Sequence, residues 1–78
     1  MVLMDSVGER LPVLLYAGED GWIVAECPLI PGCVSQGRDR AEALQQIQEA
    51  IALCLEARRE EGWRLPDRYE VLDVPIGG

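Results

Sequence analysis

The chain is predicted to fold as a two-layer α+β domain with the order β-β-β-α-β, one helix covering one face of a mixed four-stranded sheet. The turn dipeptide Asp20-Gly21 separates two apolar runs, which is the pattern of a β-hairpin. Between Asp39 and Gly62, apolar residues recur with the 3.6-residue period of a helix. A β-type run follows, and a right-handed crossover would place it beside the first strand, giving the sheet order 3-2-1-4.

Length and composition predict a single domain over residues 1–78. A chain of this size buries only about 60% of the surface that it exposes when unfolded, so we expect copies of it to share a core as a homodimer or higher oligomer. No apolar run approaches the roughly 18 residues that a membrane helix needs. Met1-Val2-Leu3-Met4 lacks the basic start of a signal peptide, which predicts a cytoplasmic protein.

The charge of the chain favours one class of partner. Fourteen acidic residues oppose seven basic ones, all arginine, and the formal net charge is −7. An acidic domain repels phosphate backbones at long range, and the arginines are scattered along the sequence, so autonomous DNA or RNA binding is not expected. A basic protein partner is favoured instead.

The first strand is predicted over residues 11–17, after a segment, 1–10, that could form an extra edge strand or lie loose. Both alternating faces of this strand are apolar, which suits a strand covered on both sides. One helix can cover only one of them. The other face is therefore expected to contact a second subunit or a partner.

The second strand is predicted over residues 22–27, with Ile23, Ala25 and Cys27 under the helix. Trp22, Val24 and Glu26 would then lie on the opposite face, as a partner or oligomer interface. Alternatively, Trp22 folds over the end of the hairpin as local core. Pro28 and Pro31 bracket a rigid, partly apolar loop, and this loop adds two further interface candidates, Leu29 and Ile30.

A short third strand, residues 33–36, leads through Gly37 to the helix. Asp39 and Glu42 form a capping box in which Asp39 accepts the amide at the third helical position and Glu42 returns to the amide of Asp39. The apolar stripe that follows predicts the face of the helix that packs on the sheet, and it comprises Ala43, Leu44, Ile47, Ala50, Ile51, Cys54 and Leu55.

The helix is expected to end at Gly62. Trp63 would pack against its end. Residues 69–76 are predicted as the closing strand, with Leu72, Val74 and Ile76 facing the helix and Pro75 indicating an edge or an unpaired end.

Three cysteines and no histidine restrict the chemistry of the chain. The spacings of Cys27, Cys33 and Cys54 match neither a zinc knuckle nor a disulfide framework. Two readings stay open: three buried thiols in a reducing compartment, or a Cys27 to Cys33 bridge across the proline loop. No metal or cofactor is expected.

Several segments in register resemble the HicB-type antitoxin domain. They are Gly21-Trp22-Ile23-Val24-Ala25-Glu26-Cys27-Pro28, then Pro31-Gly32-Cys33-Val34-Ser35-Gln36-Gly37, then Glu42-Ala43 and Ala50-Ile51. The resemblance spans residues 11–56. It implies a truncated ribonuclease-H-like fold and a role in a toxin-antitoxin system, in which the protein would occlude the active site of a small basic HicA-like toxin that cleaves mRNA.

Many members of that family continue into a segment that binds operator DNA, and this sequence ends at Gly78, so DNA binding is not expected of it. The chain could instead be a solitary homo-oligomeric relative with another partner.

The implied ribonuclease-H ancestry also raises an opposing hypothesis, in which Asp20, Glu26, Asp39 and Glu42 bind divalent metals and hydrolyse phosphodiesters. Active enzymes of that fold carry an aspartate in the middle of the first strand, whereas residues 11–17 contain no acid. Without histidine, and with Glu42 assigned to the helix cap, the chain is predicted not to be an enzyme.

Overall fold

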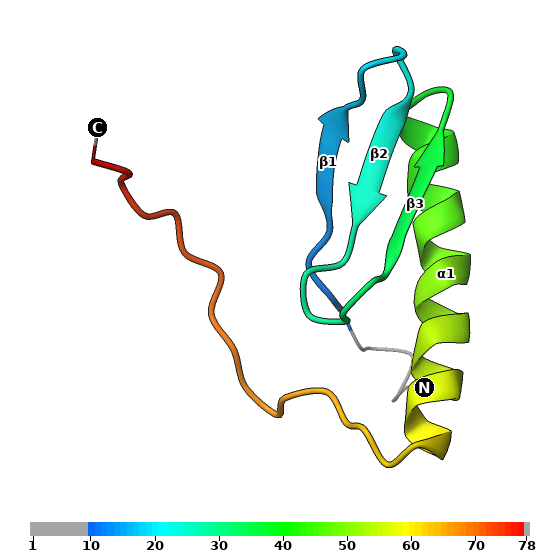
Figure 1. Cartoon of the computed structure of the whole chain (residues 1–78), viewed down its shortest axis with the longest axis vertical. Helices are drawn as coiled ribbons and strands as arrows, with labels where there is room; N and C mark the ends of the chain where they lie inside the picture. Colours follow the sequence, from blue (N-terminus) through cyan, green and yellow to red (C-terminus); the bar gives the residue numbers. More distant parts are fainter. Residues whose placement is uncertain (1–9, 78) are drawn as a thin grey trace, which may run out of the picture.

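The computed structural model describes residues 10–77 and has an α+β architecture. Its elements are β1 (Leu14–Ala17), β2 (Ile23–Glu26), β3 (Val34–Gly37) and α1 (Arg40–Glu60). The strands form an antiparallel sheet in the order β1-β2-β3, and the helix lies along one face of it (Figure 1). The predicted hairpin, third strand and helix are confirmed, while residues 1–9, where an extra edge strand was considered, lie outside the described residues.

The hairpin between β1 and β2 is closed by the predicted turn. Asp20 Oδ1 accepts a hydrogen bond from the backbone nitrogen of Trp22 at 3.1 Å, and Gly21 adopts a φ of 87° that side chains rarely tolerate. Gly18 donates its amide to the carbonyl of Trp22 at 2.7 Å. This turn fixes the register that sets Leu14 opposite Glu26.

The proline loop between β2 and β3 is held from two sides. At its base, the amide of Cys27 donates to the carbonyl of Cys33 at 3.0 Å, which begins the β2–β3 ladder. From the helix, Arg58 Nη2 donates to the carbonyl of Pro31 at 3.0 Å, and the same guanidinium lies 5.4 Å from the ring centroid of Trp63. Arg58 thereby ties the loop to the last turn of α1, and Trp63 packs against that end as predicted.

Both ends of α1 are capped by the residues that the sequence indicated. Asp39 Oδ1 accepts the amide of Glu42 at 2.8 Å, and Glu42 Oε1 accepts the amide of Arg38 at 2.6 Å, rather than that of Asp39 as predicted. At the other end Gly62 has a φ of 89°, and the amide of Trp63 donates to the carbonyl of Arg58 at 2.9 Å. These bonds satisfy helix-end groups that would otherwise need water.

Replacing the N-cap residue Asp39 measures how much its hydrogen bond contributes to the free energy of unfolding. In an Asp39→Ala variant the Glu42 amide loses its acceptor, and we expect the free energy of unfolding to fall by about 1 kcal/mol. Urea unfolding followed by circular dichroism measures this change. Asp39→Asn keeps an acceptor at the same place and should unfold close to the wild type, so an equal loss in both variants would contradict a capping role.

The core lies between the sheet and α1. Its buried residues come from β2, the proline loop and the helix, and they are Ala25, Cys27, Ile30, Cys33, Ala43, Ile47 and Leu55. Buried Gly37, at the end of β3, lies against the first turn of α1: a Cβ added there would meet the carbonyl carbon of Glu42 at 2.7 Å. The absence of a side chain at Gly37 therefore sets how closely the helix approaches the sheet.

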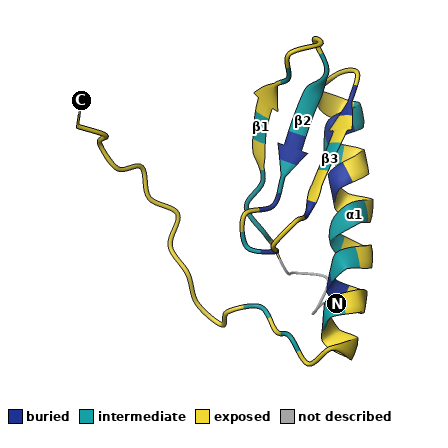
Figure 2. Cartoon of the chain, in the orientation of Figure 1, coloured by how far each residue is buried: buried dark blue, intermediate teal, exposed yellow. Residues whose placement is uncertain are grey.

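The closing strand is the part of the predicted fold that the structure corrects. Residues 70–77 form no strand within the described chain, so the sheet has three antiparallel strands instead of four in the mixed order 3-2-1-4. They extend away from the sheet and are exposed along their length (Figures 1 and 2). The segment has the right residues for a strand, but β-propensity stabilises a strand only where it packs on a neighbour.

A smaller difference concerns the extent of the first strand. The first strand covers only residues 14–17 of the predicted 11–17, because the antiparallel register with β2 begins at Leu14. Among the described residues, no helix is long and apolar enough to cross a membrane.

Candidate interaction surface

The sheet face that points away from α1 carries three exposed large hydrophobic residues, Leu14, Tyr16 and Val34. The registers put two rows of three residues on it, and we call these six residues the outer face: Leu14, Glu26 and Val34 in one row, Tyr16, Val24 and Gln36 in the other. Leu14 is 51% exposed, Tyr16 49% and Val34 51%. The helix buries the opposite face, where Ala25 is 0% exposed.

The outer face combines apolar side chains with a small polar group. The Tyr16 hydroxyl donates to Glu26 Oε1 across the β1–β2 pair at 3.4 Å, and Gln36 lies exposed at the end of the second row. An aromatic ring and aliphatic side chains around one carboxylate are typical of protein interfaces, where the apolar atoms supply burial and the polar atoms fix orientation. The outer face is therefore suited to another protein surface.

The structure divides the predicted interface residues into two groups. Val24 and Glu26 lie on the outer face and are half-buried, as the alternation of β2 indicated, and Trp22 is half-buried directly before that strand. Leu29 is half-buried and packs on the core, whereas Ile30 is 1% exposed and belongs to the core itself. Ile30 was expected at the surface, but the proline loop turns it inward.

Sequence reasoning did not name three residues that dominate this surface. Leu14 and Tyr16 lie on one of the two apolar faces of the first strand, and the sequence did not indicate which of these faces the helix would leave open. Val34 was missed because β3 is too short to show an alternation by itself. The pairing of β3 with β2 could have placed Val34 on the outer face, because Val34 stands opposite Glu26 and Glu26 was already placed there.

The carboxylates of the nuclease hypothesis each have a separate structural role. Asp20 closes the hairpin, Asp39 and Glu42 cap the helix, and Glu26 accepts the Tyr16 hydroxyl. Within residues 10–77 there is no group of three or more His, Cys, Asp or Glu residues placed to hold a metal ion.

The three cysteines are free thiols, and they meet between the proline loop and the helix. Cys27 and Cys33 are buried, and Cys54 is half-buried. Burial, together with a hydrogen bond to Cys54, raises the pKa of Cys33 from 9.0 to about 12. A thiol with so high a pKa stays protonated at neutral pH and is a poor nucleophile. The predicted alternative of a Cys27 to Cys33 bridge is not formed.

The raised pKa of Cys33 makes the fold sensitive to alkali. The folded state keeps the Cys33 proton up to about pH 12, whereas the unfolded chain releases it near pH 9.0, so more protons are bound by the folded state between these values. We expect the contribution of Cys33 to stability to be complete below pH 9 and to be lost as pH rises toward 12. Urea unfolding across this range measures the loss. A Cys33→Ala variant should show a smaller decline, and an equal decline would contradict the assignment.

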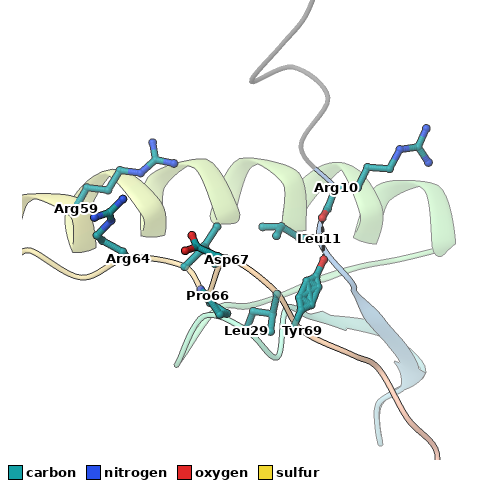
Figure 3. Close-up of a pocket in the computed structure, with 9 residues that line it drawn as sticks. Arg10, Leu11, Leu29, Arg59, Arg64, Pro66, Asp67 and Tyr69 are labelled. Carbon is teal, nitrogen blue, oxygen red and sulfur yellow. Dashed lines mark hydrogen bonds between the residues drawn. The ribbon is translucent and has the colours of Figure 1, made fainter.

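A second, more polar surface feature lies at the base of the sheet, below α1. It is a hollow of about 450 Å³ lined by Arg10, Leu11, Leu29, Arg59, Arg64, Leu65, Pro66, Asp67 and Tyr69 (Figure 3). The Tyr69 hydroxyl donates to the carbonyl of Arg10 at 3.0 Å, which fastens the connector to the chain just before β1. Figure 3 shows the Arg10 guanidinium pointing away from the other arginines. Arg59, Arg64 and Asp67 lie in the part of the hollow away from Arg10.

Comparison with known proteins gives relatives of similar length. The chain is 37% identical over 66 residues to a UPF0150 protein of Thermoplasma acidophilum, an alignment that covers 83% of this chain and 96% of that protein. It is also 44% and 43% identical to two UPF0150 proteins of Synechocystis sp., over 69% and 67% of this chain and 68% and 72% of theirs. No family model matches the chain, and no solved structure matches it significantly. The relatives' names state no activity.

Proposed function

The chain belongs to the UPF0150 family, and we propose that it is a non-enzymatic, HicB-like antitoxin module that neutralises a small basic toxin. The toxin would be an mRNA-cleaving protein of HicA-like type, met in the cytoplasm. The antitoxin would act by occlusion: it covers the catalytic site or the RNA groove of the toxin and performs no chemistry of its own.

The observation that carries this proposal is the exposed outer face. Leu14, Tyr16 and Val34 each leave about half of their surface open on a sheet whose other face is closed by α1. Apolar side chains gathered on one rigid surface are what a stable protein contact uses, and the central residues of such a surface give most of the binding energy. A partner that covers this face would complete a sheet with both sides buried.

The charge of the chain supports a basic partner. A net charge of −7 on 78 residues attracts a cationic, RNA-binding protein and speeds its approach. An acidic surface also competes directly with RNA for the same basic groove. Added salt should therefore weaken the complex by screening this attraction.

The resemblance to HicB antitoxins falls on the part of the fold that forms the outer face. Residues 21–37 build β2, the proline loop and β3, which together supply four of its six members. The truncated ribonuclease-H-like sheet that this resemblance implies, in the order 3-2-1-4, would require a fourth strand beside β1, which residues 10–77 do not form in the single chain. Within residues 10–77 the outer edge of β1 is open for such a strand.

A homo-oligomer is the alternative, in which copies of the chain cover one another's outer faces and no toxin exists. The exposed apolar side chains favour this reading as much as a heterologous complex. The two are separated by stoichiometry: a toxin complex contains a second, basic chain, whereas a homo-oligomer leaves the outer face closed to it.

The test uses any small basic protein that the neighbouring reading frames encode, purified alone and with this chain, and the lack of such a reading frame would count against the proposal. We expect RNA cleavage by the basic protein to fall in proportion to the amount of chain added and to stop at a fixed molar ratio, because occlusion is stoichiometric. Co-expression should also restore growth. Cleavage that continues with the chain in excess, or growth that is not restored, would overturn the proposal.

A further inference from the structure

The C-terminal segment, residues 70–77, is the one part of the described chain that has the composition of a strand and no neighbour. We propose that this segment exchanges between two copies of the chain and pairs with the open edge of β1 in the partner copy. The inference does not rest on the proposed toxin, because it uses a different surface: the edge of the sheet instead of its outer face.

The segment exposes far more apolar surface than a soluble monomer ordinarily keeps in water. Val71 is 68% exposed, Leu72 71%, Val74 67% and Ile76 86%. Four aliphatic side chains within six residues, three of them β-branched, form a run that favours pairing in a sheet. Their alternation gives one face with Leu72, Val74 and Ile76 and a mixed face that includes Asp73.

The acceptor for this segment is the outer edge of β1, which within residues 10–77 pairs only with β2. The hydrogen bond from Gly18 to Trp22 begins a ladder in which every second residue, Tyr16 and Leu14, bonds to β2. The residues between them, Leu15 and Ala17, therefore point their amides and carbonyls outward. An uncovered strand edge of this kind is a template for another strand.

The geometry of the connector argues for a second copy as the occupant. The hydroxyl of Tyr69 donates to the carbonyl of Arg10 at 3.0 Å, so the chain is anchored just before the segment starts. From there residues 70–77 leave the sheet, and Figure 1 shows them running on the β1 side but apart from that strand. Each copy thus offers one unpaired segment and, on the side of the sheet where that segment runs, the open edge of β1, while the other open edge, that of β3, lies on the opposite side. A two-fold exchange satisfies both pairs at once and closes the assembly at two chains.

The exchange is tested with two full-length variants that damage different halves of the contact. Leu72→Asp with Val74→Asp spoils the segment, and Ala17→Pro removes an outward amide from the edge without touching the core. We expect the wild type to sediment as a dimer, at twice the 8.6 kDa of the chain, and each variant as a monomer that keeps the helical signal of its circular dichroism. The dissociation constant should rise at least about 100-fold, since exposed aspartates cannot be buried in a sheet.

Mixing the two variants distinguishes exchange from docking of the segment on its own chain. The intact segment of the Ala17→Pro chain can pair with the intact edge of the other variant, so the mixture should form a heterodimer that neither variant forms alone. A wild type that is monomeric at every concentration, segment variants that remain dimeric, or a mixture that stays monomeric would each overturn the inference. Added salt should strengthen this contact between two acidic chains, which separates it from a toxin complex.

Discussion

A Gly37→Ala variant is expected to lose about 3 kcal/mol of stability, the upper end of what overpacking a core usually costs. Gly37 ends β3 where the first turn of α1 crosses the sheet. A Cβ at this position would stand 2.7 Å from the carbonyl carbon of Glu42 and 2.9 Å from the Cα of Ala43. These are backbone atoms, so no side-chain rotation relieves the contact, and the helix must move away from the sheet.

The loss is measured by urea unfolding of the variant beside a matched glycine replacement. Gly77→Ala adds the same methyl group where no heavy atom lies within 4 Å, and we expect it to be neutral. A small domain has little stability in reserve, so Gly37→Ala should be partly unfolded even without denaturant. Equal stability of the two variants would show that the helix does not pack against β3 as closely as described.

The second large effect concerns binding. Leu14→Arg places a cation on the outer face, where it replaces apolar contact with repulsion against a basic partner. We expect the dissociation constant of the proposed antitoxin–toxin complex to rise by at least about 100-fold, the effect of losing an apolar residue that anchors an interface. Leu14 is 51% exposed, so the fold should survive the change. Isothermal titration with the purified basic partner measures it.

The control is the same substitution on the other side of the molecule. Leu53 lies on α1 and is 67% exposed, and Leu53→Arg changes the net charge of the chain by the same amount as Leu14→Arg. Long-range attraction to a basic partner should weaken equally in both variants. We therefore expect Leu53→Arg to cause only a small loss. A loss as large as that of Leu14→Arg would assign binding to overall charge and not to the outer face.

Local signals predicted most of the fold. Asp20-Gly21 gave the hairpin, and Asp39 with Glu42 gave the start of the helix, because each is a contact between residues close in sequence. The period of the apolar stripe gave the buried side of the helix, including Ala43 and Ile47. The β2 alternation likewise placed Val24 and Glu26 on the exposed face, as the register has it.

The features that the sequence did not predict correctly depend on contacts between distant parts of the chain. The β-type composition of residues 70–77 predicts a strand, but composition does not say which edge will accept it or from which molecule. Ile30 looked like a surface residue because prolines flank it, while its burial depends on how the loop folds back over the core. Val34 became visible only through its register with β2. The sequence close to these residues does not determine their strand partner, their burial or the face on which they lie.

Methyl-resolved NMR of the chain, titrated with the proposed basic partner, tests the central claim most directly, because it reports which surface is covered. The outer face should respond: the methyl signals of Leu14, Val24 and Val34 shift or broaden, while those of Leu53 on the exposed side of α1 keep their positions. If the signals of Leu53 move and those of Leu14 and Val34 do not, the partner binds the helix side and the outer face is not the antitoxin surface.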